Sequence, residues 1–181
     1  MLKKRGTAFG VLAVVLIFGT LFGTWRSLNG LRRDTLEYFY TGVDESGYGI
    51  ATNLDLRVEY ARNLCKIAEK YDAAAETGAV QSACTALEDA EDFGAKYDAN
   101  NDLAGAVEAL SMKLAGQALS QEDESYRKSL TADIASYEMK IDKLATPFNQ
   151  EVRSFNQDAL GSFPGGILGR LTGVKELEEF A

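Results

Sequence analysis

The chain has 181 residues, of which 46% are hydrophobic and 25% charged, and this suits one membrane segment plus one globular domain. Six of the 19 basic residues flank an apolar N-terminal run, whereas all 27 acidic residues lie from Asp34 onward, which leaves the domain with 13 basic residues and a net charge of −14. Such a surface makes nucleic acid a poor partner, and the absence of histidine removes the commonest general base and metal ligand.

The first predicted element is an apolar helix over residues 7–25. It has 19 residues without a charge and spans roughly 29 Å, close to the ~30 Å hydrocarbon thickness of a bilayer. A basic flank at residues 1–6 and the pair Trp25-Arg26 stand where headgroups would lie. A cleaved signal peptide is the alternative. The apolar centre of a signal peptide is shorter than this run, however, and no A-x-A-like cleavage site follows it. We expect an uncleaved single-pass anchor, and the basic residues slightly favour a cytoplasmic N-terminus with the domain outside.

Residues 26–162 are predicted to form an all-α domain, a long antiparallel bundle of about four helices. The membrane helix should continue into this domain until Asp44–Gly49 breaks it. From Ile50, apolar residues recur at steps of three and four and predict a helix ending near Thr77-Gly78. Arg57 is expected to lie mainly off the apolar face of this helix.

The next predicted helix runs from Val80 to Ala118. Its apolar stripe keeps its phase across Asp98–Asp102, where we expect a frayed or kinked middle. A last helix should begin at Ser120, a cap-type residue three positions before an acid. Pro147 should kink or restart it, because proline lacks an N–H and crowds the preceding turn. Strand content should be near zero.

Two Phe-Asn pairs lie seven residues apart in this last helix, Phe148-Asn149 and Phe155-Asn156. The spacing points each ring inward and leaves each asparagine able to bond a neighbouring helix or loop. Phe163-Pro164-Gly165-Gly166 should then end the helix, since the glycines permit positive φ. A tail over residues 163–181 should dock on the bundle end through its apolar residues, Ile167, Leu168, Leu171, Val174, Leu177 and Phe180.

Residues 148–180 resemble the C-terminal signature of the LemA family, in which aromatic-Asn pairs, a Phe-Pro and a Gly-containing tail ending in Phe close an antiparallel bundle carried on a membrane helix. The matching residues are Phe148, Asn149, Phe155, Asn156, Phe163, Pro164, Gly173 and Phe180. Motif similarity is confined to this tail, and Tyr38–Gly49 departs from the usual pattern, as in a divergent member. The resemblance implies a bacterial membrane-anchored bundle and implies no reaction.

The remaining chemistry-bearing residues favour structure over catalysis. With a helical turn near Gly78, Cys65 and Cys84 would be offset by roughly 10 Å, beyond the ~7 Å limit for a disulfide, so we expect buried free thiols. Acidic clusters should be solvated, because di-metal bundles use Glu-x-x-His. The tail glycines follow a helix and lack a Lys-Ser/Thr, unlike a phosphate loop. No catalytic residue, cofactor or metal site is predicted.

The sequence therefore favours a non-catalytic scaffold or protein-interaction module of LemA type in the bacterial cell envelope. Its expected partners are the lipid bilayer, through residues 7–25, and another protein. The alternative is a membrane-anchored sensor that binds a ligand between bundle helices, which a polar, partly unfilled pocket would favour. An enzyme is a third possibility, for which no nucleophile-base pair or metal set can be assembled.

Overall fold

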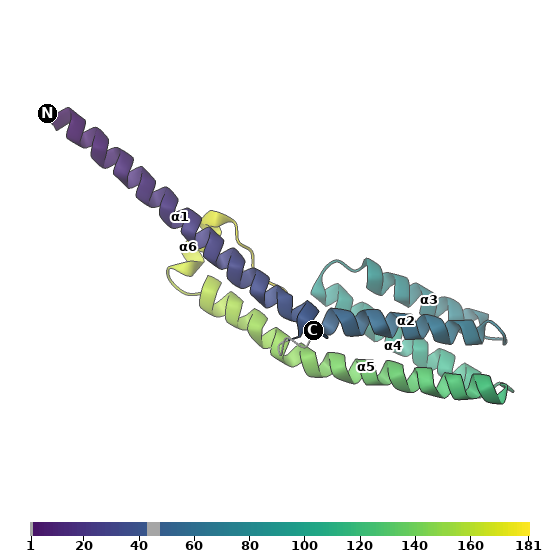
Figure 1. The fold of residues 1–181 in the computed structure, drawn as a ribbon. Coiled ribbons are helices and arrows are strands. Elements are labelled where there is room, and N and C mark those ends of the chain that lie inside the picture. Colours follow the sequence, from purple (N-terminus) through teal and green to yellow (C-terminus); the bar gives the residue numbers. More distant parts are fainter. Residues whose placement is uncertain (1, 43–47) are drawn as a thin grey trace. The chain divides into compact units, whose positions relative to one another are not determined.

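The computed structural model describes residues 2–42 and 48–181, and within these ranges it is all-helical, with no strand, as predicted (Figure 1). The helices are α1 (Leu2–Thr41), α2 (Ile50–Ala68), α3 (Ala74–Asp89), α4 (Phe93–Ala115), α5 (Gln121–Ser154), the π-helical η1 (Phe155–Leu160) and α6 (Gly165–Thr172). The chain divides into two units. Unit 1 comprises Met1–Leu36 and Gln150–Leu177, and unit 2 comprises Glu37–Asn149 and Glu178–Ala181.

In unit 1, α1 exposes large apolar side chains along its N-terminal half. Those with at least half of their surface exposed are Phe9, Val11, Leu12, Val14, Val15, Leu16, Ile17, Phe18 and Phe22. The stretch Ala8–Thr41 is long and apolar enough to cross a bilayer, and none of its most apolar window is buried. A signal sequence near an N-terminus would have the same length and composition. The helix runs unbroken to Thr41, as predicted, while most of the expected break at Asp44–Gly49 lies outside the described residues.

The first turn in unit 2 lies earlier than predicted. α2 ends at Ala68 and α3 begins at Ala74, so the expected helix end at Thr77-Gly78 is wrong. Alanines on both sides of the turn keep the apolar stripe in phase and conceal the break. Tyr71, which the stripe placed on the helix, instead lies in the turn, where its hydroxyl donates to Asp123.

The predicted single helix from Val80 to Ala118 is wrong, because two helices, α3 and α4, occupy this stretch. α3 ends at Asp89, and α4 begins after Asp92, whose carboxylate accepts a hydrogen bond from the Ala95 N–H at 2.6 Å. This is a standard N-cap, which satisfies a free donor of the first turn. The stretch Asp98–Asp102 is helical throughout, so the expected frayed or kinked middle is wrong. Asn100 is tolerated there because it is buried and accepts a hydrogen bond from another helix.

The last long helix begins where predicted and stays regular for longer. Ser120 Oγ accepts a hydrogen bond from the Asp123 N–H at 3.1 Å, which confirms the predicted cap. α5 then continues through Pro147 to Ser154, so the expected restart at Pro147 is wrong. Proline removes one N–H, and buried side chains on either side, Ile141 and Phe148, hold the helix. The hydrogen-bond pattern changes only at Phe155, where η1 begins.

The core of unit 2 is built from apolar side chains of α2, α3 and α4, which pack against one another, together with α5. Residues of α5 contact two of the other helices. The rings of Tyr60 and Tyr137 meet edge to face at 5.3 Å, and the hydroxyls of Ser111 and Thr131 lie 3.4 Å apart. Each fully buried leucine or isoleucine in such a core contributes about 1.5–3 kcal/mol.

Candidate functional site

An aromatic cluster in unit 2 gathers residues from distant parts of the chain. The ring of Phe39 lies 4.5 Å from Phe93, 5.4 Å from Phe148 and 5.9 Å from Phe180, measured between ring centroids. Tyr97 meets the ring of Phe180 edge to face at 5.4 Å. Phe39, Phe148 and Phe180 are each at most 1% exposed. The tail residue Phe180 is therefore part of the core of unit 2.

Asn149, the residue after Phe148, fixes the backbone of Phe180. Its Nδ2 donates to the Phe180 carbonyl at 2.9 Å, and its Oδ1 accepts from the Phe180 N–H at 2.8 Å. The side-chain amide of Asn149 thus satisfies both the N–H and the carbonyl of Phe180. Because Asn149 is buried, losing either bond would leave a polar group without water.

Asn156 makes the same pair of hydrogen bonds in unit 1. Its Nδ2 donates to the Leu177 carbonyl at 2.8 Å, and its Oδ1 accepts from the Leu177 N–H at 2.9 Å. Phe155 is buried beside it, and Leu177 is 6% exposed. The sequence predicted that the two asparagines bond a helix or a loop, and the loop is the C-terminal tail.

The turn before α6, at Phe163-Pro164-Gly165, does not have the predicted conformation. Phe163 is 84% exposed, and its bond to Pro164 is cis. Positive φ occurs among the described glycines at Gly42 and Gly173 and not at Gly165, so the expected reason for that glycine is wrong. A Cβ on Gly165 would stand 1.9 Å from the Ala159 carbonyl oxygen, and this close backbone approach is what excludes a side chain.

The tail docks through only part of the expected set. Leu177 and Phe180 are buried, and Leu168 and Val174 are partly buried. Ile167 and Leu171 are 58% and 68% exposed, so their predicted docking is wrong. Gly173, with φ +73°, caps α6 in the left-handed conformation and lets the chain leave the helix towards Leu177.

A cavity of about 340 Å³ opens in unit 2. Its lining comes from the end of α1, from α2, from the end of α3 and from α4: Phe39, Tyr40, Ala51, Thr52, Leu54, Asp55, Val58, Leu87, Glu88 and Lys96. Two carboxylates and one ammonium group meet an apolar wall here. Glu88 is already paired with Arg62 at 2.6 Å, and the other charged residues of the lining are Asp55 and Lys96.

A buried arginine links three helices of unit 2. Arg57 is fully buried, contrary to its expected place off the apolar face. Its Nη1 donates to the Asn100 side-chain oxygen and, at 3.3 Å, to the Asn100 carbonyl, while Nη2 lies 3.1 Å from Glu138 Oε2. Its Nε meets no acceptor among the described residues. Burial lowers the pKa of Arg57, and the carboxylates of Glu138 and Asp142 oppose that shift.

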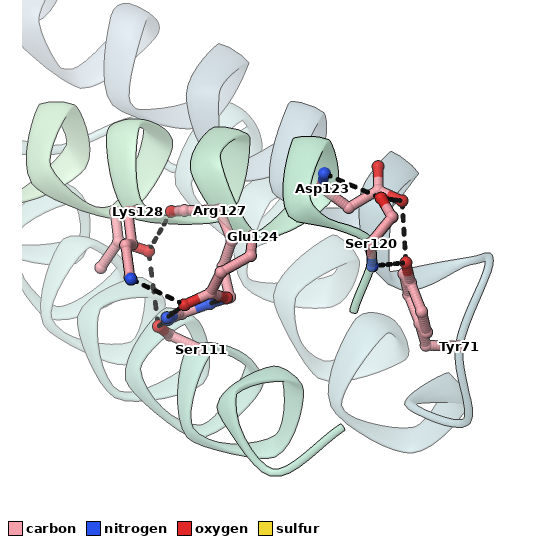
Figure 2. A network of polar contacts seen from close by, with 8 residues as sticks. Tyr71, Ser111, Ser120, Asp123, Glu124, Arg127 and Lys128 are labelled. Atoms are coloured by element: carbon pink, nitrogen blue, oxygen red, sulfur yellow. Dashed lines mark hydrogen bonds and ion pairs between the residues drawn. The ribbon is translucent and has the colours of Figure 1, made fainter. Parts of the chain in front are cut away.

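A second polar network joins the turn after α2 to the start of α5 (Figure 2). The Tyr71 hydroxyl donates to Asp123 Oδ2 at 2.8 Å and accepts from the Ser120 N–H at 3.1 Å. Lys70 Nζ lies 2.7 Å from Asp123 Oδ1. Hydrogen bonds from Lys70 and Tyr71 lower the pKa of Asp123. Spacing alone could not reveal this network, because Tyr71 and Asp123 are far apart in the sequence.

A separate set of polar contacts centres on Glu124, the next residue of α5 (Figure 2). Both guanidinium nitrogens Nε and Nη2 of Arg127 donate to the Glu124 carboxylate, at 2.7 and 2.8 Å, and Nη1 donates to Ser111 Oγ of α4 at 3.1 Å. Lys128 Nζ lies 3.1 Å from the same carboxylate (Figure 2). Hydrogen bonds from Arg127 and Lys128 lower the pKa of Glu124 to about 2. These contacts connect helices and bring no nucleophile next to a base.

The two cysteines are free and buried, as predicted. Cys65 Sγ lies 3.9 Å from the Thr77 carbonyl oxygen, and Cys84 Sγ lies 4.0 Å from that of Val58. Both pairs are centred on Tyr71, so the assumed centre at Gly78 is wrong. The offset of the cysteines is nevertheless unchanged at seven residues, because the new centre lies six residues after Cys65 and thirteen before Cys84.

Comparison with known proteins finds no matching family model, no matching curated protein and no matching solved structure. Within the described part of the chain, no group of three or more Cys, Asp or Glu side chains could hold a metal ion. The described residues therefore offer two features with functional potential, the asparagine contacts to the tail and the cavity lined by four helices.

Proposed function

We propose that the protein is a non-catalytic scaffold or protein-interaction module, anchored by α1 in the membrane of a bacterial cell envelope. The observation that carries this proposal is the composition of α1. Its N-terminal half exposes many large apolar side chains in a stretch without charge, which water disfavours and a bilayer accommodates. The same helix ends in unit 2, where Phe39 belongs to the aromatic cluster. One helix would thus serve both as membrane anchor and as part of the folded domain.

We further propose that α2 to α5 form the antiparallel four-helix bundle expected from the sequence. Two sets of contacts support it. Cys65 meets Thr77 whereas Cys84 meets Val58, so later residues of α3 contact earlier residues of α2. Lys70 likewise pairs with Asp123 whereas Arg57 pairs with Glu138. Such reversed order is what antiparallel neighbours produce.

The LemA-type assignment is also a proposal, supported by the use of the two asparagines. Asn149 bonds both backbone groups of Phe180, and Asn156 bonds both backbone groups of Leu177. The Phe-Asn repeat thus has a purely structural use, in holding the tail, which favours a scaffold over an enzyme. The acidic domain would suit a protein partner with a basic surface.

Membrane fractionation combined with protease accessibility tests this proposal. The full chain should remain in the membrane pellet after carbonate extraction, and a variant lacking residues 1–25 should be released. Protease added to cells without their outer barrier should digest the domain if the N-terminus is cytoplasmic. Protection would reverse the orientation and leave the anchor in place. Release of the full chain by carbonate would overturn the anchor itself.

The cavity supports a second candidate, a membrane-anchored sensor that binds a small molecule between helices. Its volume is at the lower end of the range for ligand sites, and Asp55 and Lys96 offer one charge of each sign. A zwitterionic metabolite suits this pair. A thermal-shift screen of free amino acids should then raise the melting temperature of the parent chain and leave an Ala51→Trp variant, with the cavity filled, unmoved. A flat screen would favour the scaffold.

A further inference from the structure

We infer that α6 lies in the headgroup region of the membrane, beside the point where α1 leaves the bilayer, with one apolar face in contact with lipid. This surface, called the α6 face, consists of Phe163 in the turn before α6 and of Ile167 and Leu171 in α6. Their exposed fractions are 84%, 58% and 68%, which is high for large apolar side chains. Ile167 and Leu171 are four residues apart in α6 and therefore lie on one side of it. The inference rests on the proposed membrane anchor.

The contacts of Gly169 set the depth of α6 within unit 1. Gly169 is buried, and a Cβ there would stand 2.8 Å from Leu160 Cδ2 and 3.7 Å from Leu28 Cδ1. The missing side chain makes room for Leu160 of η1, and it leaves α6 at ordinary van der Waals distance from Leu28 of α1. Leu28 lies three residues after Trp25, or about 4.5 Å along the helix. Trp25 ends the apolar run, and tryptophan gathers at membrane interfaces, so α6 is placed at headgroup level.

The chemistry of α6 fits this depth. Arg170 is exposed, and its long side chain can reach a lipid phosphate while its stem stays with apolar neighbours. The Thr172 hydroxyl donates to the Leu168 carbonyl at 2.8 Å, so its proton is satisfied inside the helix. An apolar face beside a cation is the pattern of a helix lying in an interface. With eight residues, α6 adds lipid contact to that of α1 and does not replace it.

Lipid is favoured over a protein as the occupant of the α6 face because the face continues an apolar surface. The α6 face belongs to a helix that packs against Leu28. Leu28 lies just beyond the exposed apolar run of α1 that ends at Trp25. A water-soluble partner at that level would have to share the site with headgroups. A second copy of the chain remains a distinguishable outcome, since it would shield the face from lipid as well as from water.

Spin-label accessibility on the full chain tests the inference. Ile167→Cys and Leu171→Cys would each be labelled with a nitroxide in vesicles of phosphatidylcholine and phosphatidylglycerol. Met139→Cys is the matched control, since Met139 is a comparably exposed apolar residue, at 66%, in the other unit. Phe18→Cys reports on the anchor. The parent chain, labelled in the same way, measures any signal from the buried Cys65 and Cys84.

The expected result is high accessibility to oxygen and low accessibility to a water-soluble nickel chelate at 167 and 171, with the reverse at 139. If 167 and 171 resemble 139 while Phe18→Cys is lipid-exposed, the inference fails and the anchor stands. If Phe18→Cys is also accessible to the nickel chelate, the anchor fails and the inference with it. Shielding of 167 and 171 from both reagents, with spin-spin broadening, would assign the face to a second copy and overturn the lipid contact. Unchanged circular dichroism melts would show that each labelled variant is folded.

Discussion

The side-chain amide of Asn149 both donates to and accepts from the backbone of Phe180, at 2.9 and 2.8 Å. Aspartate at this position would keep the shape and the acceptor but lose the donor, and its charge would face the Phe180 carbonyl. Asn149→Asp should therefore lower the free energy of unfolding by about 1–3 kcal/mol at neutral pH, measured by urea unfolding in a mild detergent.

Asn101→Asp makes the same chemical change on the exposed side of α4 and serves as its control. The difference between Asn149→Asp and the parent should shrink in acid, because a protonated carboxyl can again donate to Phe180. A loss at Asn149 no larger than that at Asn101 would mean that the tail is not held through this amide.

Replacing Asn100 should remove the side-chain acceptor of the buried Arg57 Nη1. Asn100→Leu preserves volume but removes the side-chain acceptor, and a hydrogen bond to a charged group is worth about 1.5–3 kcal/mol. We expect a loss of that size in urea unfolding, against little change for the exposed neighbour Asn101→Leu. Adding Arg57→Met should recover part of the loss, since a buried ion can often be replaced by an apolar residue. Additive losses would contradict the coupling of these two residues.

The two thiols of unit 2 should not react with a thiol reagent until the unit unfolds. Burial raises the pKa of Cys65 to about 11 and also raises the pKa of Cys84, and the thiolate is the reactive form. Ellman's reagent at pH 8 should therefore find almost no thiol in the folded chain and two after denaturation without reductant. Ser82→Cys, on the exposed side of α3, should react at once. Zero thiols after denaturation would indicate a disulfide and refute the present register.

Glu124 should make the domain sensitive to acid. Its pKa is lowered from 4.5 to about 2 by Arg127 and Lys128, so its ionised form stabilises the folded state. That contribution is complete above pH 4.5 and is lost as the pH falls towards 2. Glu124→Gln should melt at a lower temperature than the parent at pH 7, and the gap should close over this range. Glu108→Gln removes an exposed acid of α4 and serves as the matched control for the loss of one carboxylate.

Patterns of apolar residues predicted the helical class, the apolar run of α1 and the start of α5 at Ser120. These features depend on neighbours within a few residues, which periodicity and capping report directly. The turn at Tyr71 was missed because alanines carry the stripe across it. The cap at Asp92 could have been predicted, because an aspartate precedes the first turn of α4. The break was instead predicted at Asp98–Asp102, because that stretch is more polar.

The use of polar residues was harder to predict. Arg57 occupies the apolar face of α2, between Leu54 and Ala61, yet its charge suggested exposure. Its burial depends on Asn100, 43 residues away, and no local pattern reports that distance. Glycine was expected at residue 165 because it permits positive φ, whereas the actual reason is the close approach of the Ala159 carbonyl oxygen. The order of residues in the sequence does not report such an approach.

Phe39 and Phe180 meet in one aromatic cluster, although almost the whole folded domain lies between them in the sequence. During translation α1 emerges first, and if it is the anchor it enters the bilayer before Phe93, Phe148 and Phe180 exist. With α1 as the proposed anchor, unit 2 would close only after the chain is tethered. A chain stopped before the tail would present an open aromatic surface at the membrane, which quality-control proteases could recognise.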